Sequence, residues 1–124
     1  MRRQIRLIAF ALTALLFTSA CTPAELALYL TSTSEVRDVL DVDDLYRLRE
    51  CESTDNYQAI SNTGAFRGAY QFNQTTWDDV ASRFFPWLEN RDPATVEAWW
   101  QDAMARALWS ERGKQPWPIC GNRV

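Results

Sequence analysis

Apolar positions recur at helical spacing in three stretches of the chain, which are separated by segments without that period. The first stretch, "DVDDLYRLRE", covers residues 41–50. Its acidic residues come early and its arginines late, which is the order that the helix dipole favours. Asp41 or Asp43 can cap it by accepting hydrogen bonds from the first backbone N–H groups. The pattern predicts a helix over residues 41–50.

The second stretch begins at "TTWDDV", and the spacing of Thr76 and Asp79 fits a capping box. We expect this helix to run to about Phe84. The segment "FFPWLENRDP" then interrupts the pattern with a proline and several polar residues.

The third stretch, "DPATVEAWWQDAMARALWSERG", is the longest of the three. Asp92 is a suitable cap, Pro93 suits the first helical position and Gly113 can end the helix. A continuous helix is therefore expected between these residues. Its predicted core face consists of Val96, Trp99 or Trp100, Ala103, Ala107 and Leu108.

The segment from Ser53 to Gln71 has no helical period and is rich in Asn, Ser, Thr and Gly. Within it, "TGAFRGAYQF" alternates small and aromatic residues, which favours a short hairpin or an irregular lobe. The 124 residues suffice for one domain. The predicted fold is a small, mainly α domain over residues 42–124, with α+β character contributed by the lobe.

The first 20 residues have the layout of a secretory signal peptide. Three arginines precede an uncharged apolar segment of 11 residues, Leu7–Phe17, and small residues follow in "TSAC". A helix of that length is too short to span a bilayer, which takes about 20 residues. We therefore expect residues 1–20 to be a signal peptide of an exported protein, with a buried helix as the alternative.

Cys21 stands where a lipoprotein signal places its lipidated cysteine, although Thr18 occupies a position at which leucine is usual. The alternative is ordinary cleavage after Ala20 or Ala24. The protein would then be secreted to the cell wall, whereas lipidation would anchor it to a membrane. Residues 21–41 are interpreted as a tether that leads from the membrane.

Charge and cysteine content limit the possible partners. Without the three arginines of the signal peptide, 10 basic residues remain against 16 acidic ones, a net charge of about −6. Such a chain does not favour nucleic acid as a partner. Export implies an oxidising compartment. If Cys21 carries a lipid, Cys51 and Cys120 remain and can pair, which would stabilise a domain with a small core.

The chain contains no histidine, which excludes serine–histidine and cysteine–histidine pairs and histidine-ligated zinc. It also has no Gly-rich phosphate loop, so carboxylate chemistry remains. Glu52 follows Cys51 at the C-terminal end of the first predicted helix, where the helix dipole disfavours the ionised form. If aromatic residues also exclude water, the pKa of Glu52 rises and it can serve as a general acid. The alternative is a solvated surface carboxylate.

Four motifs together resemble the transglycosylase-like domain of resuscitation-promoting factors. They are "CES" at 51–53, "NYQAISNTG" at 56–64, "GAYQFNQTTW" at 68–77 and "WPIC" at 117–120. The order "ES…SNTGAFRGAYQ" is also similar to the wider lytic transglycosylases. The resemblance covers about Leu45 to Gly121. It implies a lysozyme-like fold and, as the substrate, the β-1,4 bond between N-acetylmuramic acid and N-acetylglucosamine in peptidoglycan.

The resemblance also implies roles for single residues. Glu52 matches the catalytic acid, Thr63 and Gln71 match residues that contact the sugar, and Cys51 and Cys120 match a disulfide.

This chain departs from the family pattern in the segment that follows. Ser61 is an extra residue, "AFRGAY" replaces a more Gly-rich run, and the "FFPWLENRDP" connection is longer and more charged. Tyr57, Tyr70 and Trp77 are candidates for stacking on sugar faces in a cleft, and packing in the core is the alternative for each.

Asp55, Asp78 and Asp79 do not occupy matched catalytic positions, so the resemblance implies a mechanism with one carboxylate. The N-acetyl oxygen of the substrate would attack C1 while Glu52 protonates the leaving oxygen. Glu52 would then deprotonate the sugar's 6-hydroxyl, which gives an anhydro product, or a water, which is muramidase hydrolysis. This chemistry needs no metal or organic cofactor, and we expect a monomer.

Two other functions stay open at this point. The same fold could be a non-catalytic peptidoglycan-binding module of a cell-wall assembly. The chain could also be an exported interaction protein, such as a lysozyme inhibitor or an adhesin, which would not need an acid at the start of the loop.

Overall fold

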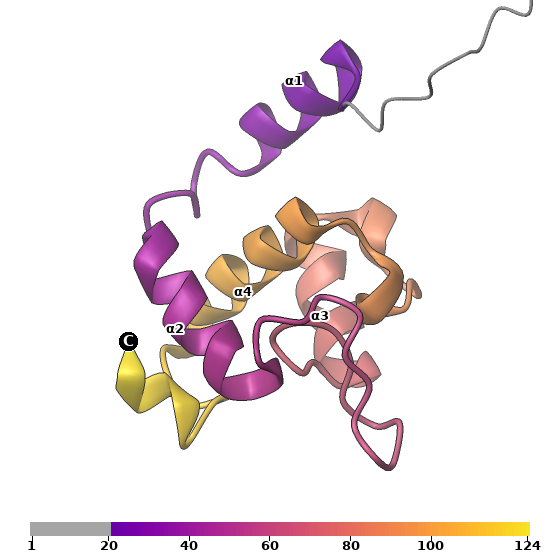
Figure 1. Ribbon diagram of the computed structural model, residues 1–124. Coiled ribbons are helices and arrows are strands. Elements are labelled where there is room, and N and C mark those ends of the chain that lie inside the picture. The colour runs from indigo at the N-terminus through magenta and orange to yellow at the C-terminus, as the bar shows by residue number, and fades with distance from the viewer. Residues whose placement is uncertain (1–20) are drawn as a thin grey trace, which may run out of the picture.

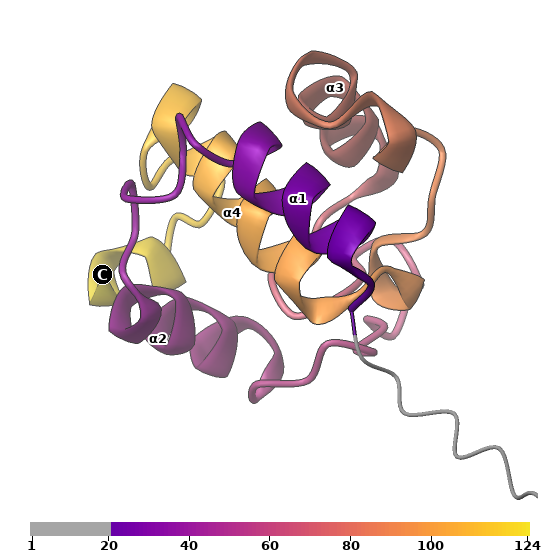
Figure 2. The same ribbon diagram turned by 90° about the horizontal axis from the view of Figure 1, so that it is seen from above.

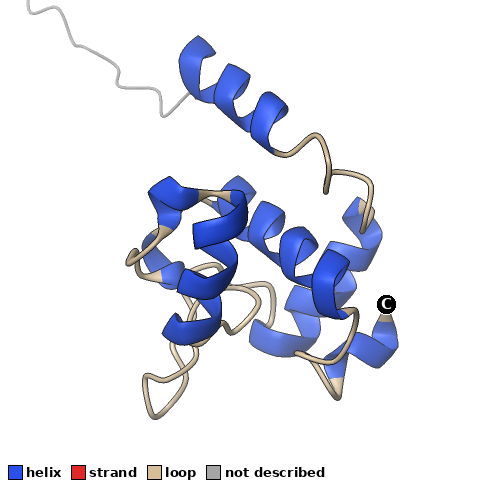
Figure 3. Cartoon of the chain, turned by 180° about the vertical axis from the view of Figure 1, so that it is seen from behind, coloured by secondary structure: helices blue, strands red, loops and turns tan. Residues whose placement is uncertain are grey.

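The computed structural model describes residues 21–124, and the predicted signal peptide, residues 1–20, lies outside the described residues. The described part is mainly helical, as predicted (Figure 3). Its α-helices are α1 Pro23–Ser32, α2 Val42–Ser53, α3 Gln74–Phe84 and α4 Ala98–Arg112. Three short 3₁₀ helices complete it: η1 Pro86–Leu88, η2 Pro93–Thr95 and η3 Cys120–Arg123.

Helix α4 runs through the middle of the molecule, with α2 and α3 on either side of it (Figure 1). Trp100, Ala103, Ala107 and Leu108 are buried, which confirms the predicted core face of this helix. Helices α2, α3 and α4, the segment before α2 and the lobe after it bury apolar residues together in one core.

Helix α2 begins after Asp41, whose side chain accepts a hydrogen bond from the Asp44 backbone N–H at 2.8 Å, as one of the two predicted caps. The helix runs three residues beyond the predicted end at Glu50. It stops at Thr54, which adopts the left-handed conformation with φ 57°. Glu52 therefore lies inside the last turn of α2.

The predicted capping box at Thr76 and Asp79 is wrong. The cap of α3 is Asn73, whose side chain accepts a hydrogen bond from the Thr76 backbone N–H at 2.8 Å. Asp79 lies within the helix and forms ion pairs with Arg83 and Arg112 instead. Asn is as good a cap as Ser or Thr, and the helix begins at Gln74, three residues before the start at Trp77 that a cap at Thr76 would give.

The prediction of a continuous helix from Asp92 is also wrong for the first residues of that stretch. Asp92 caps η2, and Val96 is extended, with ψ 146°, before α4 begins at Ala98. The Val96 carbonyl accepts a hydrogen bond from Gln101 Nε2 at 2.8 Å, and its side chain is buried. The Gln101 side chain on α4 thus satisfies the carbonyl of an extended residue that precedes the helix. Gly113 ends α4 at φ 57°, as predicted.

The predicted hairpin or irregular lobe lies between α2 and α3 (Figure 1). Two isolated antiparallel bridges, Ile60 to Arg67 and Arg67 to Phe72, define it, and residues 21–124 contain no regular strand. Arg67 also forms two hydrogen bonds, of 2.6 and 2.5 Å, to the Asp92 carboxylate. The lobe is thus fixed to the connection that precedes α4.

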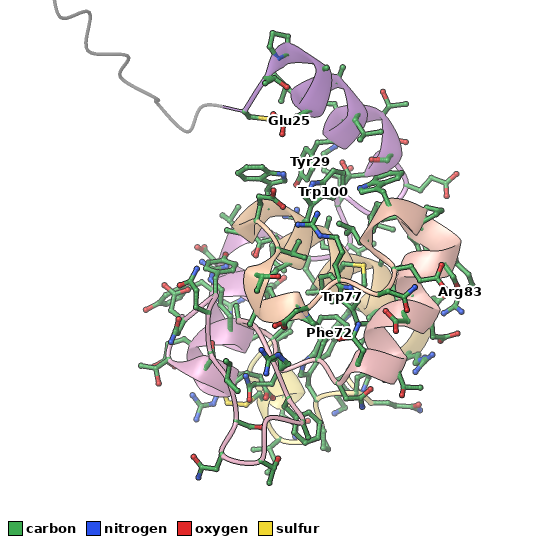
Figure 4. All side chains as sticks on the ribbon, turned by 90° about the vertical axis from the view of Figure 1, so that its right-hand side faces the viewer. Glu25, Tyr29, Phe72, Trp77, Arg83 and Trp100 are labelled. Atoms are coloured by element: carbon green, nitrogen blue, oxygen red, sulfur yellow. A yellow bond between two sulfur atoms is a disulfide. The ribbon has the colours of Figure 1, made fainter. Side chains whose placement is uncertain are left out.

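The segment interpreted as a tether differs from a free leash. It contains α1, which lies over α4 and contacts it through the rings of Tyr29 and Trp100, 5.3 Å apart (Figures 2 and 4). Val36 and Leu40, which follow α1, are 2% exposed. Burial of these two apolar side chains stabilises the segment against the body, so the packed part of the chain begins before Val42. None of the helices between residues 21 and 124 is long and apolar enough to cross a membrane.

The predicted disulfide between Cys51 and Cys120 is present, and Cys21 is free and exposed. The disulfide joins the last turn of α2 to the start of η3, and η3 packs beside α2. The C-terminal residues are thereby held next to Glu52.

Candidate active site

Glu52 faces a groove between the end of α2 and the C-terminal residues. Its side chain is half-buried and lines a cavity of about 520 Å³. The other lining residues are Cys51, Phe66, Gln71, Pro116, Trp117, Pro118, Ile119 and Cys120. The disulfide at Cys51 fixes the helix turn that carries Glu52 beside this groove.

Burial raises the pKa of the Glu52 carboxyl group above its usual range. Among the described residues, neither an opposite charge nor a hydrogen bond counteracts that effect. Glu52 also lies at the negative end of the α2 dipole, which disfavours the ionised form further. The carboxyl group therefore keeps its proton at a higher pH than an ordinary glutamate, as a general acid requires.

Gln71, at the end of the lobe, lines the same cavity as Glu52. Its backbone is left-handed, with φ 52°, a conformation that a residue other than glycine adopts at a cost. Its side-chain Nε2 donates to the Gly68 carbonyl at 3.0 Å. Backbone strain of this kind concentrates at functional sites.

The groove continues past Gln71 into a second cavity of about 310 Å³. The two cavities share Phe66, Gln71, Pro116 and Trp117. The polar lining of the second cavity comes from Asn73, Thr76, Arg112 and Gln115. Apolar and aromatic surfaces bordered by amides and hydroxyls suit a sugar, because its ring faces are apolar and its edges form hydrogen bonds.

A family model described as "Transglycosylase-like domain" matches residues 40–120. The chain belongs to the transglycosylase-like domain family. This confirms the resemblance read from the four motifs, whose first and last members contain Glu52 and Cys120.

Two curated relatives are similar to this transglycosylase-like domain. Both are named "Probable transglycosylase SceD", from Staphylococcus aureus strains bovine RF122 / ET3-1 and MRSA252, and each is 33% identical over 96 residues. The match covers 77% of this chain and 38% of each relative, so the chain spans about two fifths of their length. No solved structure gives a significant match.

Within this transglycosylase-like domain, the structure brings Glu52 and Gln71 together at one cavity. Thr63 instead lies at the exposed tip of the lobe, where its hydroxyl accepts from the Ala65 backbone N–H at 3.3 Å. It is outside the lining of both cavities.

The three aromatic residues considered for stacking on sugar faces do not present their rings to the groove. Tyr70 borders the second cavity but is only 1% exposed, and Trp77 is fully buried, so neither ring is open to a sugar face and core packing, the alternative, applies to both. Trp77 Nε1 donates to the Leu88 carbonyl at 2.9 Å. Tyr57 is half-buried and lies outside both cavity linings; its hydroxyl donates to Asp102.

Sequence reasoning assigned no role to Phe66 or Ile119, although both lie in quoted motif segments. Phe66 is 46% exposed and lines both cavities, and Ile119 is 78% exposed at the Glu52 end. Exposed apolar side chains beside a cavity indicate a binding surface. The alternation of small and aromatic residues in "TGAFRGAYQF" was the available signal for Phe66.

We expect Gln71→Gly to be more stable than Gln71→Ala by about 1 kcal/mol in this domain. Both substitutions remove the hydrogen bond to the Gly68 carbonyl. Only glycine adopts the positive φ of position 71 without the steric cost of a Cβ atom. Urea denaturation of the two variants measures the difference. Equal stabilities, or a more stable alanine variant, would show that position 71 is not strained.

Proposed function

We propose that the chain is an exported enzyme that cleaves the β-1,4 bond between N-acetylmuramic acid and N-acetylglucosamine in peptidoglycan, with Glu52 as its single catalytic acid. The observation that carries the proposal is a half-buried carboxyl group with a raised pKa on a groove lined by apolar and amide surfaces. Family membership supports the same chemistry. The alternative of a non-catalytic binding module would use the groove without the acid.

The proposed reaction needs one carboxyl group because the substrate supplies the nucleophile. Protonated Glu52 donates its proton to the glycosidic oxygen as the bond to C1 breaks, while the N-acetyl carbonyl oxygen of the same sugar attacks C1. Glu52, now ionised, then removes a proton from the sugar's 6-hydroxyl or from a water. The oxygen that loses this proton attacks C1 and displaces the N-acetyl oxygen, which restores the acetamido group. Attack by the 6-hydroxyl closes a 1,6-anhydro ring, and attack by water gives a reducing end.

Gln71 and Phe66 are the proposed substrate contacts nearest to Glu52, since all three line the same cavity. The Gln71 carboxamide can bond a sugar hydroxyl or N-acetyl group, and the exposed Phe66 ring can stack on a sugar face. Thr63, at the tip of the lobe, would contact a strand that extends beyond the groove.

Digestion of purified peptidoglycan tests the proposal directly. The released fragments, separated and weighed by mass spectrometry, should be muropeptides cut after N-acetylmuramic acid. Anhydro ends would identify a lytic transglycosylase, and reducing ends a muramidase. Retention of the protein on peptidoglycan without any released fragment would contradict the enzyme and favour the binding module.

We also propose that residues 1–20 are a signal peptide and that Cys21 carries a lipid anchor, so that the enzyme stays at the membrane. Cys21 is exposed and forms no disulfide, which leaves its sulfur available for modification. Cys21→Ala should move the protein from the membrane fraction to the soluble one, and immunoblots of the fractions measure the shift. A wild-type protein that is soluble, with an unmodified mature N-terminus, would rule out lipidation and favour simple secretion.

A further inference from the structure

One carboxylate oxygen on α4 accepts hydrogen bonds from two tyrosines, one in the segment after Glu52 and one beside Gln71. Asp102 Oδ1 accepts from the Tyr57 hydroxyl at 2.8 Å and from the Tyr70 hydroxyl at 2.6 Å. Tyr57 follows Glu52 by five residues, and Tyr70 directly precedes Gln71. Asp102 itself is outside the lining of both cavities.

The neighbouring residue on α4 connects the same two segments through their backbones. Gln101 Oε1 accepts from the Ala69 N–H at 2.9 Å, and its Nε2 donates to the Tyr57 carbonyl at 3.0 Å. Gln101 is 1% exposed and fully hydrogen-bonded. The backbone at Tyr57 is therefore already fixed, and Asp102 fixes the outer ends of the two tyrosine side chains.

Arg49 joins this cluster from α2, one turn before Glu52. Its Nη1 lies 4.0 Å from Asp102 Oδ1 and 3.5 Å from the Tyr70 hydroxyl, and its guanidinium lies over the Tyr57 ring, 5.5 Å from its centroid. The helix that carries Glu52 thus contacts the same carboxylate as the segment that carries Gln71.

We propose that Asp102 is a positioning residue that holds Glu52 and Gln71 at the separation required for glycan cleavage. This inference rests on the proposed function. Its physical basis is that the reaction requires the acid and the substrate contacts to be placed within fractions of an ångström, and a misplacement of about 1 Å can lower a rate 100-fold.

Both tyrosine hydroxyls donate to the same oxygen atom of Asp102. A substitution at position 102 should therefore disturb the two tyrosines only if it removes this acceptor. Asn at position 102 keeps an acceptor oxygen at that place, whereas Ala removes it. Burial, and next the Asp102 carboxylate, raise the pKa of both tyrosine hydroxyls, so both remain donors at any working pH. We therefore expect Asp102→Asn to preserve the arrangement and Asp102→Ala to release it.

Steady-state cleavage of soluble peptidoglycan fragments by the full chain tests the proposal. Asp102→Ala should lower kcat by about 10- to 100-fold, with a smaller change in KM, while Asp102→Asn stays within about threefold of the wild type. Val36→Ala is the control: it removes buried apolar contacts outside the groove and should leave kcat unchanged at a temperature at which every variant is folded.

A second readout does not depend on turnover. In NMR spectra, Asp102→Ala should shift the Gln71 side-chain amide signals and the titration of the Glu52 carboxyl carbon, and Asp102→Asn should shift neither appreciably. A folded Asp102→Ala protein with unchanged kcat and unchanged signals would overturn the inference. Equal losses in Asp102→Ala and Asp102→Asn would overturn the role of the shared acceptor oxygen, because the charge that faces Arg49 would then matter instead. A wild type that cleaves nothing would contradict the proposed function alone.

Discussion

Glu52→Gln should lower the rate of peptidoglycan cleavage by about 10³-fold or more, in a protein that stays folded and still binds glycan. A general acid contributes about 10²- to 10⁴-fold to a rate, and this chain has no second matched carboxylate that could replace it. Glutamine keeps the size of the side chain and its fit in the cavity but has no proton to give. Muropeptide release by wild type and variant, measured at equal concentration, gives the ratio.

Glu50→Gln is the matched control for this experiment. It makes the same chemical change two residues earlier on α2, at a side chain that pairs with Arg123 and lies outside the groove lining. It should leave cleavage unchanged. If Glu52→Gln retains wild-type turnover, or if Glu50→Gln loses as much, Glu52 is not the acid.

The pH dependence gives a second check on the same assignment. The acid acts in its protonated form, so wild-type activity should fall as the pH rises through the raised pKa of Glu52. The folded state holds the Glu52 proton more tightly than the unfolded state does. The contribution of this proton to the free energy of unfolding is therefore complete below the pKa that Glu52 has in the unfolded state, and it is lost as the pH rises through the pKa in the folded state. Glu52→Gln should remove that part of the pH dependence of stability.

Removal of the Cys51–Cys120 disulfide should lower the free energy of unfolding by about 4 kcal/mol. The bond closes a loop with a sequence separation of 69 residues, and the chain-entropy model gives that value for such a loop. The core of this small domain has little reserve against a loss of this size. Urea denaturation of the double variant Cys51→Ser, Cys120→Ser measures it.

Cys21→Ser serves as the control, because Cys21 is exposed and unpaired and its replacement should leave the stability unchanged. A loss below about 1 kcal/mol in the double variant would contradict the chain-entropy estimate. Activity should fall as well, since the disulfide fixes the helix turn that carries Glu52 to the C-terminal wall of the groove.

Local signals in the sequence predicted α2 and the place of Glu52 well. The cap at Asp41 and the order of charges along the helix depend only on neighbouring residues, so they can be read without the fold. The motif order predicted the family, and the cysteine count and the motifs together predicted the disulfide partner of Cys51. The lipid on Cys21 stays a prediction.

Contacts between distant segments account for what the sequence did not predict. Val96 leaves the helical conformation because its carbonyl bonds the Gln101 side chain, which also connects to backbone 32 residues earlier in the chain. Tyr70 is buried because its hydroxyl finds Asp102, again 32 residues away. An exposed and a buried tyrosine look alike in a sequence, since the difference lies in a partner that only the fold supplies.

The packing of α1 determines how the molecule would stand on a surface to which its N-terminal end is attached. The helix leaves the body on the side of α4, whereas the end of α2, the lobe and η3, which border the groove, lie at the opposite end (Figures 1 and 4). Helix α1 lies over α4 rather than extending away from the body, and the residues after it are packed. Attachment at Cys21 would therefore keep the body close to the attachment surface and point the groove away from that surface.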